Sequence, residues 1–496
     1  MKRTLLVPCT LAVLAILALA ACGQKTPEPP ASSNAGEAPA APPAAPSAAA
    51  REQEAREIAV DAYIFGYPLV TMEMTRRVLT NVVAPTGRQA PMGQFVRLRE
   101  YPTAAFREVP AANADTLYTA AWFDVSREPW IVSQPEMKDR YFLMPMLDGW
   151  TTVFAAPGTR TTGGGAQKYA ITGPGWSGKL PPGVSEYKSP TAIVWLLGRI
   201  YSSGTPDDYK AVHALQDRFT AVPLRGYGER YAVTAGRVDP DVDDKLAVRS
   251  QVDQLDAVAY FKLLAELLVT NPPTAEDAAV VARMANIGLL PGHAFATDKL
   301  DPAVLKGLAD APTIAREKIA GWMTAAVEAG DSRNENGWLV TTRTGIYGTD
   351  YLQRAFIATI GLGANRPQDE VYTTSVADAE GRPYSGSNDY RLHFEKGQMP
   401  PVNAFWSLTL YDSDFFFVDN ELERYALGSH SRLRTNQDGS VDIYLQRESP
   451  GGDREANWLP APDGEFILML RLYWPREKDP SILDGSWKIP PVTLVP

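Results

Sequence analysis

The spacing of apolar residues changes along the chain and divides it into helical and strand-like stretches. Apolar side chains recur every three to four residues from Arg51 to about Thr80, which predicts an amphipathic helix that Gly66 and Pro68 interrupt. Between about residues 94 and 224 the apolar runs are short, β-prone, and separated by Gly and Pro. Short strands with turn signals at this spacing predict an antiparallel sandwich.

Helical spacing returns between residues 250 and 330. Thr274 and Asp277 have the spacing of a capping box, and Asp301 followed by Pro302 predicts the first turn of another helix. We therefore expect a helical segment between two strand-rich regions. The apolar face expected for its first part consists of Val252, Leu255, Ala259, Leu263 and Leu267.

Strand-like runs resume at about residue 334 and continue to the end of the chain. The run from Glu465 to Trp474 is apolar on both faces, so we expect it to be a central strand of a second sandwich. Asp438 and Gly439 predict a hairpin turn between flanking strands. The predicted fold class is mainly β with an α segment, and a Rossmann sheet is excluded because long helices do not alternate with the strands.

The first residues have the features of an export signal. Lys2 and Arg3 precede an apolar run over residues 11–20, which is shorter than the roughly 20 residues of a membrane-spanning helix. The run leads into Leu-Ala-Ala-Cys-Gly, which resembles the lipobox of bacterial lipoproteins, where the peptide is cut before the cysteine and the cysteine is acylated. The alternative is an ordinary signal peptide that contains Cys22 by accident. By resemblance to enterobacterial sorting, Gly23 after the cysteine favours the outer membrane.

The segment after Cys22 is rich in Pro and Ala, lacks apolar periodicity, and predicts an extended tether. We therefore expect a protein of the cell envelope, attached to the outer membrane through a lipid at Cys22 and facing the periplasm. The predicted organisation is a lipoprotein signal peptide (1–21), a tether (22–50), an N-terminal helix plus β-sandwich (51–235), a helical segment (236–333) and a C-terminal β-sandwich (334–496).

Composition excludes several classes of protein. The 496 residues include 48 Lys and Arg against 58 Asp and Glu, and a net charge of −10 argues against a nucleic-acid partner. The two cysteines, Cys9 and Cys22, lie near the start, so the globular part has no disulfide, thiolate nucleophile or Cys-ligated metal. A glycine-rich segment approaches a P-loop but has Leu180 where Ser or Thr is required. We expect no cofactor and no metal; Asp412 and Asp414 fit a surface turn better than a hard-cation site.

The first candidate site combines Asn113, Asp115 and Tyr118 ahead of a predicted strand. Two residues that are two positions apart on an extended chain point to the same side, so Asn113 would orient a ligand beside Asp115, an acid or base. The alternative is an Asx-turn in which both side chains bond the local backbone.

The second candidate set consists of Arg140, Asp148, Trp150 and Arg160. Guanidinium groups near a carboxylate and an indole suit an anionic or sugar-like ligand. The alternative is a set of buried ion pairs that brace turns between strands.

Motifs in both halves resemble known bacterial families. In the N-terminal half the motifs are Pro110–Tyr118, Trp122–Asp124, Asp139–Tyr141, Gly158–Gly163 and Gly173–Trp176. In the C-terminal half they are Phe405–Asp412, Asn457–Pro462 and Arg471–Pro475. The first set resembles domain-of-unknown-function family 1254 and the second its partner family 1214. The resemblance implies an immunoglobulin-like sandwich, a helical segment and a jelly-roll-like sandwich, and it implies no activity.

These observations predict an envelope lipoprotein that binds or hydrolytically processes a polar small molecule or glycan in a cleft between the sandwiches. As an enzyme it would use Asp115 as acid or base, Asn113 to position it, and Arg140 to stabilise negative charge. The alternative is a non-catalytic binding or assembly module of the envelope. The sequence leaves open whether the protein is an enzyme and whether it forms a homo-oligomer.

Overall fold

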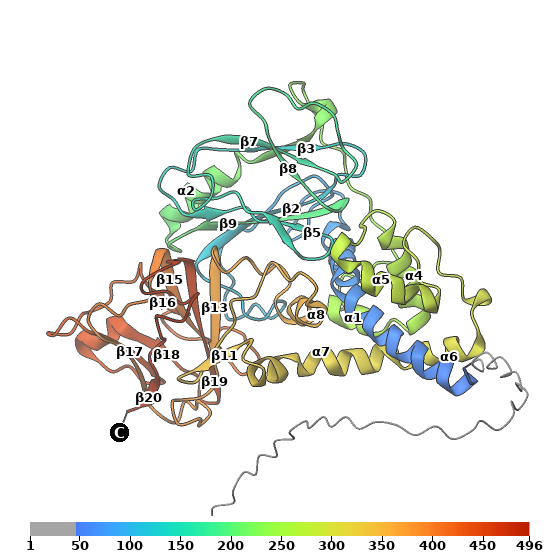
Figure 1. Ribbon diagram of the computed structural model, residues 1–496. Coiled ribbons are helices and arrows are strands. Elements are labelled where there is room, and N and C mark those ends of the chain that lie inside the picture. The colour runs from blue at the N-terminus through green and yellow to red at the C-terminus, as the bar shows by residue number, and fades with distance from the viewer. Residues whose placement is uncertain (1–45, 496) are drawn as a thin grey trace, which may run out of the picture. The chain divides into compact units, whose positions relative to one another are not determined.

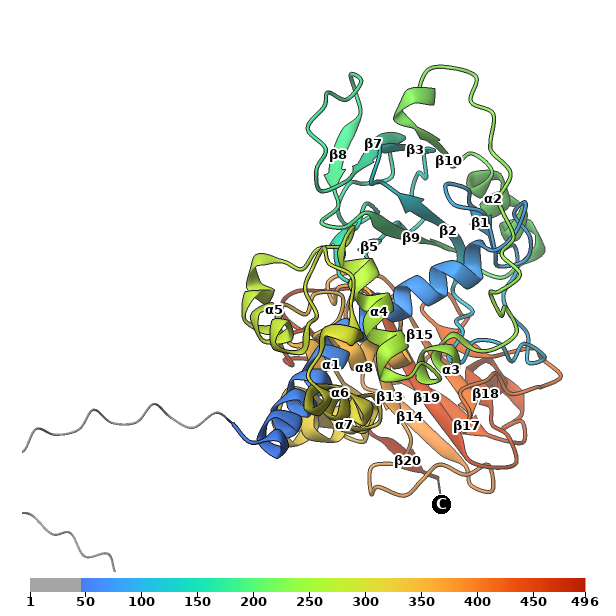
Figure 2. The same ribbon diagram turned by 90° about the vertical axis from the view of Figure 1, so that its right-hand side faces the viewer.

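The computed structural model describes residues 46–495 and begins with helix α1 (Ala48–Thr80), which is blue in Figure 1. Ser47 caps its first turn by accepting a hydrogen bond from the backbone N–H of Ala50. Figure 2 shows further helices packed along α1. These helices are α3 (Val248–Asp253), α4 (Ala257–Leu268), α5 (Ala278–Met284), α6 (Pro302–Ala309), α7 (Ala311–Glu328) and α8 (Tyr351–Ile360).

Helix α1 continues through Gly66 and Pro68, so the predicted interruption is wrong. Gly66 lies against α4, where an added Cβ would stand 2.4 Å from Leu264 Cδ2. The glycine therefore permits a close approach of the two helices. The burial that follows offsets the backbone hydrogen bond that Pro68 removes.

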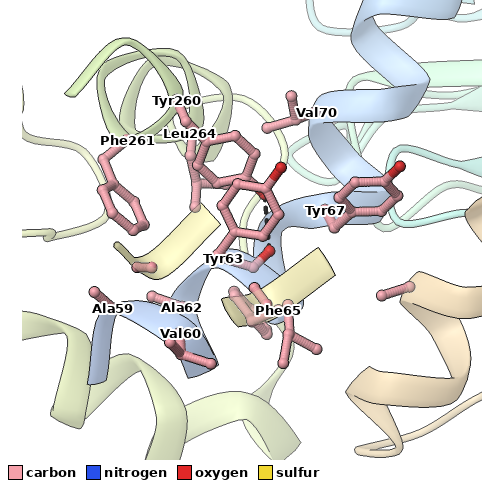
Figure 3. Packing of buried hydrophobic residues seen from close by; sticks show 14 of the residues in the cluster. Ala59, Val60, Ala62, Tyr63, Phe65, Tyr67, Val70, Tyr260, Phe261 and Leu264 are labelled. Carbon is pink, nitrogen blue, oxygen red and sulfur yellow. Dashed lines mark hydrogen bonds between the residues drawn. The ribbon is translucent and has the colours of Figure 1, made fainter. Parts of the chain in front are cut away.

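The helical body has an aromatic core between α1 and α4. The rings of Tyr63 and Tyr260 stack at 4.0 Å, and the Tyr260 hydroxyl donates to the backbone oxygen of Tyr63 (Figure 3). The buried face of α4 is rotated from the predicted one, because Leu263 and Leu267 are only half-buried. The residues fully buried on α4 are Ala257, Tyr260, Phe261, Leu264, Ala265 and Leu268.

Both predicted helix starts are confirmed. Thr274 and Asp277 form a reciprocal capping box, with the Asp277 carboxylate accepting from the Thr274 backbone N–H at 2.7 Å. Asp301 caps α6 by accepting from the backbone N–H of Ala303, and Pro302 occupies the first turn. These local signals determine where the helices begin because they satisfy backbone groups without help from distant residues.

The first strand-rich region contains two sheets that enclose a common apolar core. One sheet has the order β1-β2-β9-β5-β6 with β4 also on β9, and the other has the order β10-β3-β7-β8. The strands of the first sheet are β1 (Val96–Arg97), β2 (Thr116–Asp124), β4 (Phe142–Leu143), β5 (Met146–Asp148), β6 (Val153–Ala155) and β9 (Ile193–Tyr201). The second sheet comprises β3 (Trp130–Gln134), β7 (Gln167–Thr172), β8 (Ser185–Lys188) and β10 (Thr220–Pro223), and helix α2 (Pro206–Gln216) follows β9.

The second strand-rich region has the same two-sheet construction. One sheet has the order β11-β12-β13-β19-β15-β16, and the other has the order β18-β17-β14-β20. The first comprises β11 (Arg333–Glu335), β12 (Trp338–Val340), β13 (Glu370–Ser375), β15 (Val402–Asp412), β16 (Ala426–Gly428) and β19 (Phe466–Pro475). The second comprises β14 (Tyr390–Phe394), β17 (Val441–Gln446), β18 (Trp458–Pro460) and β20 (Val492–Leu494).

The predicted fold class, two sandwich-like regions with a helical region between them, is confirmed, and β19 is the central strand that its apolar faces predict. The hairpin at Asp438 and Gly439 is wrong: Gly439 adopts a φ of +90° in a turn, but β17 pairs with β14 and β18. The predicted domain boundaries stay predictions. Cys22 lies outside the described residues, and none of the helices within residues 46–495 is long and apolar enough to cross a membrane.

Candidate functional site

The candidate site lies where the outer faces of two sheets meet, one from each sandwich. We call this contact the junction, formed by β2 and β9 of the first sandwich and β13, β15 and β19 of the second. Alternation along each strand assigns side chains to opposite faces. In β19, Leu470 and Leu472 enter the core of the second sandwich, whereas Arg471 and Tyr473 face the junction. Both faces are buried, which explains why the run is apolar throughout.

Asp115 is the central carboxylate of the junction and is only 7% exposed. Its Oδ2 accepts hydrogen bonds from two hydroxyls of the other sandwich, Ser407 Oγ at 2.7 Å and Tyr473 OH at 3.3 Å. Burial raises the pKa of Asp115, although the charge of Arg471 and the two hydroxyls act in the opposite direction. The carboxyl group therefore keeps its proton to a higher pH than an exposed aspartic acid does.

Arg471 supplies a buried positive charge to the same junction. Its Nη2 donates to the backbone oxygen of Ala111 at 2.9 Å and to the hydroxyl of Tyr411 at 2.6 Å, and its Nη1 donates to Thr409 Oγ1 at 2.7 Å. Its Nε is buried and has no hydrogen-bond partner among the described residues. No ion pair joins Arg471 to Asp115 within the described chain. Each of the two side chains forms hydrogen bonds with uncharged oxygen-bearing groups instead.

A second pair of opposite charges extends this network. Arg199 Nη1 lies 3.2 Å from Glu370 Oε1, and Arg199 Nε donates to the Tyr118 hydroxyl at 3.3 Å. Glu370 Oε2 and Arg199 Nη1 have no hydrogen-bond partner in the described part of the chain. Burial raises the pKa of Glu370 against the opposing charge of Arg199. The Tyr372 and Tyr473 hydroxyls, 3.4 Å apart, connect this pair to Asp115.

The network approaches solvent at His430, whose side chain is exposed. The His430 ring lies 4.4 Å from the ring of Tyr201 and 5.5 Å from that of Phe405. Phe405 in turn stacks on Tyr473 at 4.2 Å. Partial burial lowers the pKa of His430 while Asp115 raises it. A row of aromatic rings therefore leads from the surface to the Asp115 carboxyl.

Asn113, Asp115 and Tyr118 come together as the sequence predicts, but Asn113 forms an Asx-turn. Its Oδ1 accepts from the backbone N–H groups of Asp115 at 3.2 Å and Thr116 at 3.0 Å. Its Nδ2 donates to the Tyr118 hydroxyl at 3.1 Å. Asn113 therefore shapes the backbone that presents Asp115, and both of its polar atoms are occupied.

Arg140 and Arg160 form ion pairs away from Asp115. Arg140 binds both carboxylate oxygens of Asp208 at 3.0 and 2.5 Å, and Arg160 binds those of Asp369 at 2.6 and 3.0 Å. Both arginines are therefore held in ion pairs, as the alternative interpretation expects, although Arg140 pairs with a residue of helix α2 and not with a turn between strands. The cation whose charge acts on Asp115 is Arg471, which is 0% exposed, and not Arg140.

Asp148 and Trp150 lie beside the helical body and not at the junction. Asp148 Oδ1 accepts from the backbone N–H groups of Trp150 at 2.8 Å and Thr152 at 2.9 Å, which closes the turn between β5 and β6. The Trp150 ring lies 5.0 Å from the guanidinium carbon of Arg354. Burial raises the pKa of Asp148 to about 6, and the two backbone N–H groups and Arg354 oppose this shift.

Asp412 and Asp414 form a surface turn. Asp412 Oδ1 accepts from the backbone N–H of Asp414 at 3.0 Å, and its Oδ2 accepts from Arg107 at 2.5 Å. An arginine thus occupies the position that a cation would need. Across residues 46–495, no group of three or more His, Cys, Asp or Glu side chains is placed to hold a metal ion.

Sequence reasoning did not identify several junction residues as site residues. One signal was available: Arg471 is a cation in an otherwise apolar strand run, and such a charge is rarely buried without a partner or a role. No local signal distinguishes the others, because each is an ordinary polar residue of a strand. The missed residues are Arg199, Glu370, Tyr372, Ser407, Arg471 and Tyr473.

Two solved structures are similar to this chain. The crystal structure of the VPA0106 protein from Vibrio parahaemolyticus aligns with a TM-score of 0.66 at 23% identity and covers 89% of this chain and 100% of that chain. An uncharacterised protein from Burkholderia cenocepacia aligns with a TM-score of 0.40 at 12% identity, with coverage of 90% and 94%. No curated protein matches the chain. The first likeness supports the fold.

Family models match both strand-rich regions. Residues 92–223 match the model "Protein of unknown function (DUF1254)", and residues 369–477 match "Protein of unknown function (DUF1214)". The first match contains Asp115 and Arg199, and the second contains Glu370, Ser407 and Arg471, so the junction draws on both. The chain therefore carries a DUF1254 region followed by a DUF1214 region, in the order that its motifs predict.

Proposed function

We propose that the junction binds a small hydroxyl-rich molecule, such as a monosaccharide or one unit of a glycan. One observation carries this proposal: the buried network contains a donor without a hydrogen-bond partner among the described residues, Arg471 Nε, and an acceptor without one, Glu370 Oε2. Buried polar atoms nearly always have hydrogen-bond partners. A hydroxyl group supplies both a donor and an acceptor, so a polyol would satisfy both kinds of atom.

The surroundings of Asp115 suit acid–base chemistry on such a ligand. A carboxyl group that stays protonated to higher pH is a general acid for the leaving oxygen of a glycosidic or ester bond. Arg471 would stabilise negative charge that develops nearby. The ligand would enter beside His430, where the rings of Tyr201 and Phe405 lie.

The variant Asp115→Asn distinguishes a role of the Asp115 carboxyl group in ligand binding from a role in the stability of the fold. The amide keeps an oxygen for the Ser407 and Tyr473 hydroxyls and removes a charge that burial disfavours, so we expect the melting temperature to stay the same or rise. A saturating ligand stabilises the unchanged protein by about 2.7 kcal/mol at one hundred times its Kd. Thermal-shift titration with monosaccharides and polyols should show this stabilisation in the wild type and its loss in the variant.

Arg382→Gln is the control because Arg382 is an exposed arginine that pairs with Asp378 and Glu380, outside the network. It should leave the ligand-induced shift unchanged. If Asp115→Asn lowers the melting temperature sharply, the carboxylate is structural. If no polyol shifts the wild type, the junction is a fixed contact, which favours the assembly module over ligand binding.

We also propose that the mature protein is anchored in the envelope by a lipid on Cys22. The apolar run before Leu-Ala-Ala-Cys-Gly and the Pro- and Ala-rich segment after it support this localisation. Cys22→Ser should move the protein from the membrane fraction to the soluble fraction, and the mass of the native N-terminus should include acyl chains on Cys22. An unmodified amino end on the native protein refutes the anchor.

A further inference from the structure

A second candidate ligand site lies in the helical body, away from the junction. Four helices line a cavity of about 200 Å³: α1 contributes Tyr67, α3 contributes Arg249 and Asp253, α7 contributes Arg316, and α8 contributes Phe356. Clefts between packed helices are a recurrent location for ligands. Drug-sized ligands occupy roughly 300–1,000 Å³, so this cavity suits a smaller molecule.

Asp253 gives the cavity a carboxylate that forms two long ion pairs and accepts no hydrogen bond within the described chain. Neither of its carboxylate oxygens accepts a hydrogen bond from the described residues, and Oδ1 is buried. The nearest cationic atoms are Arg249 Nε at 3.8 Å from Oδ2 and Arg316 Nε at 4.0 Å from Oδ1. Both distances exceed hydrogen-bond length, so Asp253 retains capacity to bind an ammonium group.

The two arginines give the same cavity an excess of positive charge. Arg249 donates no hydrogen bond within the described chain, and its side chain is 62% exposed at the rim. Arg316 anchors the end of α3 by donating from Nη1 to the backbone oxygen of Asp253 at 3.1 Å. Two guanidinium groups and one carboxylate therefore face a ligand, a set that matches one carboxylate and one ammonium group.

The remaining wall of the cavity is apolar. Tyr67 is 2% exposed, and its ring lies 5.9 Å from that of Tyr63 at a tilt of 41°. Phe356 and Ile319 are buried beside it. This wall would receive the aliphatic side chain of a ligand and remove it from water.

A second, larger cavity provides a comparison, because its lining does not combine an excess of positive charge with an apolar wall. About 450 Å³ of space lies beside the last turns of α1. Its charged lining residues are Arg76, Arg77 and Arg237 against Glu73, Asp239 and Asp241. These opposite charges balance, and Val242 is the single apolar residue of the lining, so this cavity defines no ligand class.

We propose that the cavity between α1, α3, α7 and α8 binds a free α-amino acid with an aliphatic side chain. The ammonium group binds Asp253, the carboxylate binds Arg249 and Arg316, and the side chain packs on Tyr67 and Phe356. This site is independent of the ligand proposed for the junction.

Isothermal titration calorimetry of the full chain with L-leucine tests the proposal. The expected result is saturable binding with one site per chain. 3-Methylbutylamine lacks the carboxylate and 4-methylpentanoate lacks the ammonium group, so each should bind at least about tenfold more weakly. Asp253→Asn should weaken L-leucine binding by a similar factor, because the amide has no charge for the ammonium group.

Glu317→Gln is the matched control, since it removes one exposed carboxylate of α7 outside the cavity, and it should leave the affinity unchanged. Ile360→Asp is the second variant: Ile360 is 58% exposed at the rim, so the change spares the fold and repels the ligand carboxylate. The proposal is overturned if millimolar L-leucine gives no saturable binding, if either truncated analogue binds equally well, or if Ile360→Asp leaves the affinity intact.

Discussion

Replacing Arg471 with methionine should destabilise the protein by about 1–3 kcal/mol, the usual cost of leaving buried hydrogen-bond acceptors without their donor. Methionine keeps the length of the side chain and removes the guanidinium group. The Asp115 carboxylate then lacks its largest favourable charge, and Ala111 and Tyr411 lose their donor. Urea unfolding of both proteins at neutral pH measures the loss.

The pH dependence of this loss follows from the pKa of Asp115. Removing Arg471 raises the folded-state pKa further above that of the unfolded chain, so the variant loses additional stability as the pH rises above about 4. The gap between wild type and variant should therefore narrow in acid. Arg382→Met is the control, because Arg382 is 55% exposed and its ion pair is worth about 0–1 kcal/mol. If Arg471→Met loses less unfolding free energy at neutral pH than Arg382→Met does, the charge of Arg471 does not stabilise the junction.

Asp148→Asn should have the opposite effect and stabilise the protein at neutral pH. The folded-state pKa of about 6 exceeds the ordinary value of 3.8, so ionisation of Asp148 is unfavourable in the folded state. One pKa unit corresponds to about 1.4 kcal/mol, so the gain reaches up to about 3 kcal/mol. Asparagine Oδ1 can accept the same hydrogen bonds from Trp150 and Thr152.

Measuring the free energy of unfolding as a function of pH checks the direction of the effect of Asp148→Asn. A raised carboxyl pKa means that the folded state binds more protons than the unfolded state between about pH 4 and 6, so wild-type stability falls as the pH rises through this window. The advantage of Asp148→Asn should be absent at pH 4 and complete above pH 6. Asp453→Asn, at a side chain 91% exposed, is the control for the loss of one carboxylate at the surface. Equal stability of wild type and Asp148→Asn at pH 7 would contradict the raised pKa.

Local patterns predicted the elements that depend on neighbouring residues. The caps at Thr274 and Asp301 are correct because a cap satisfies the backbone of its own first turn. The strand predicted from the run Glu465 to Trp474 is present over Phe466–Pro475, because a run that is apolar on both faces indicates a strand buried on both sides. The helix break at Pro68 failed because burial against α4 outweighs a local penalty, and Gly66 is what permits that burial.

The sequence by itself determined the order of strand-rich and helical regions, the families of those regions, the helix caps and the grouping of Asn113, Asp115 and Tyr118. Only the tertiary structure decided that Asp115 meets Ser407 and Tyr473, which lie 292 and 358 residues further along the chain. The physical reason is that periodicity reports which face of a strand is buried, whereas the partner of that face depends on how whole sheets pack.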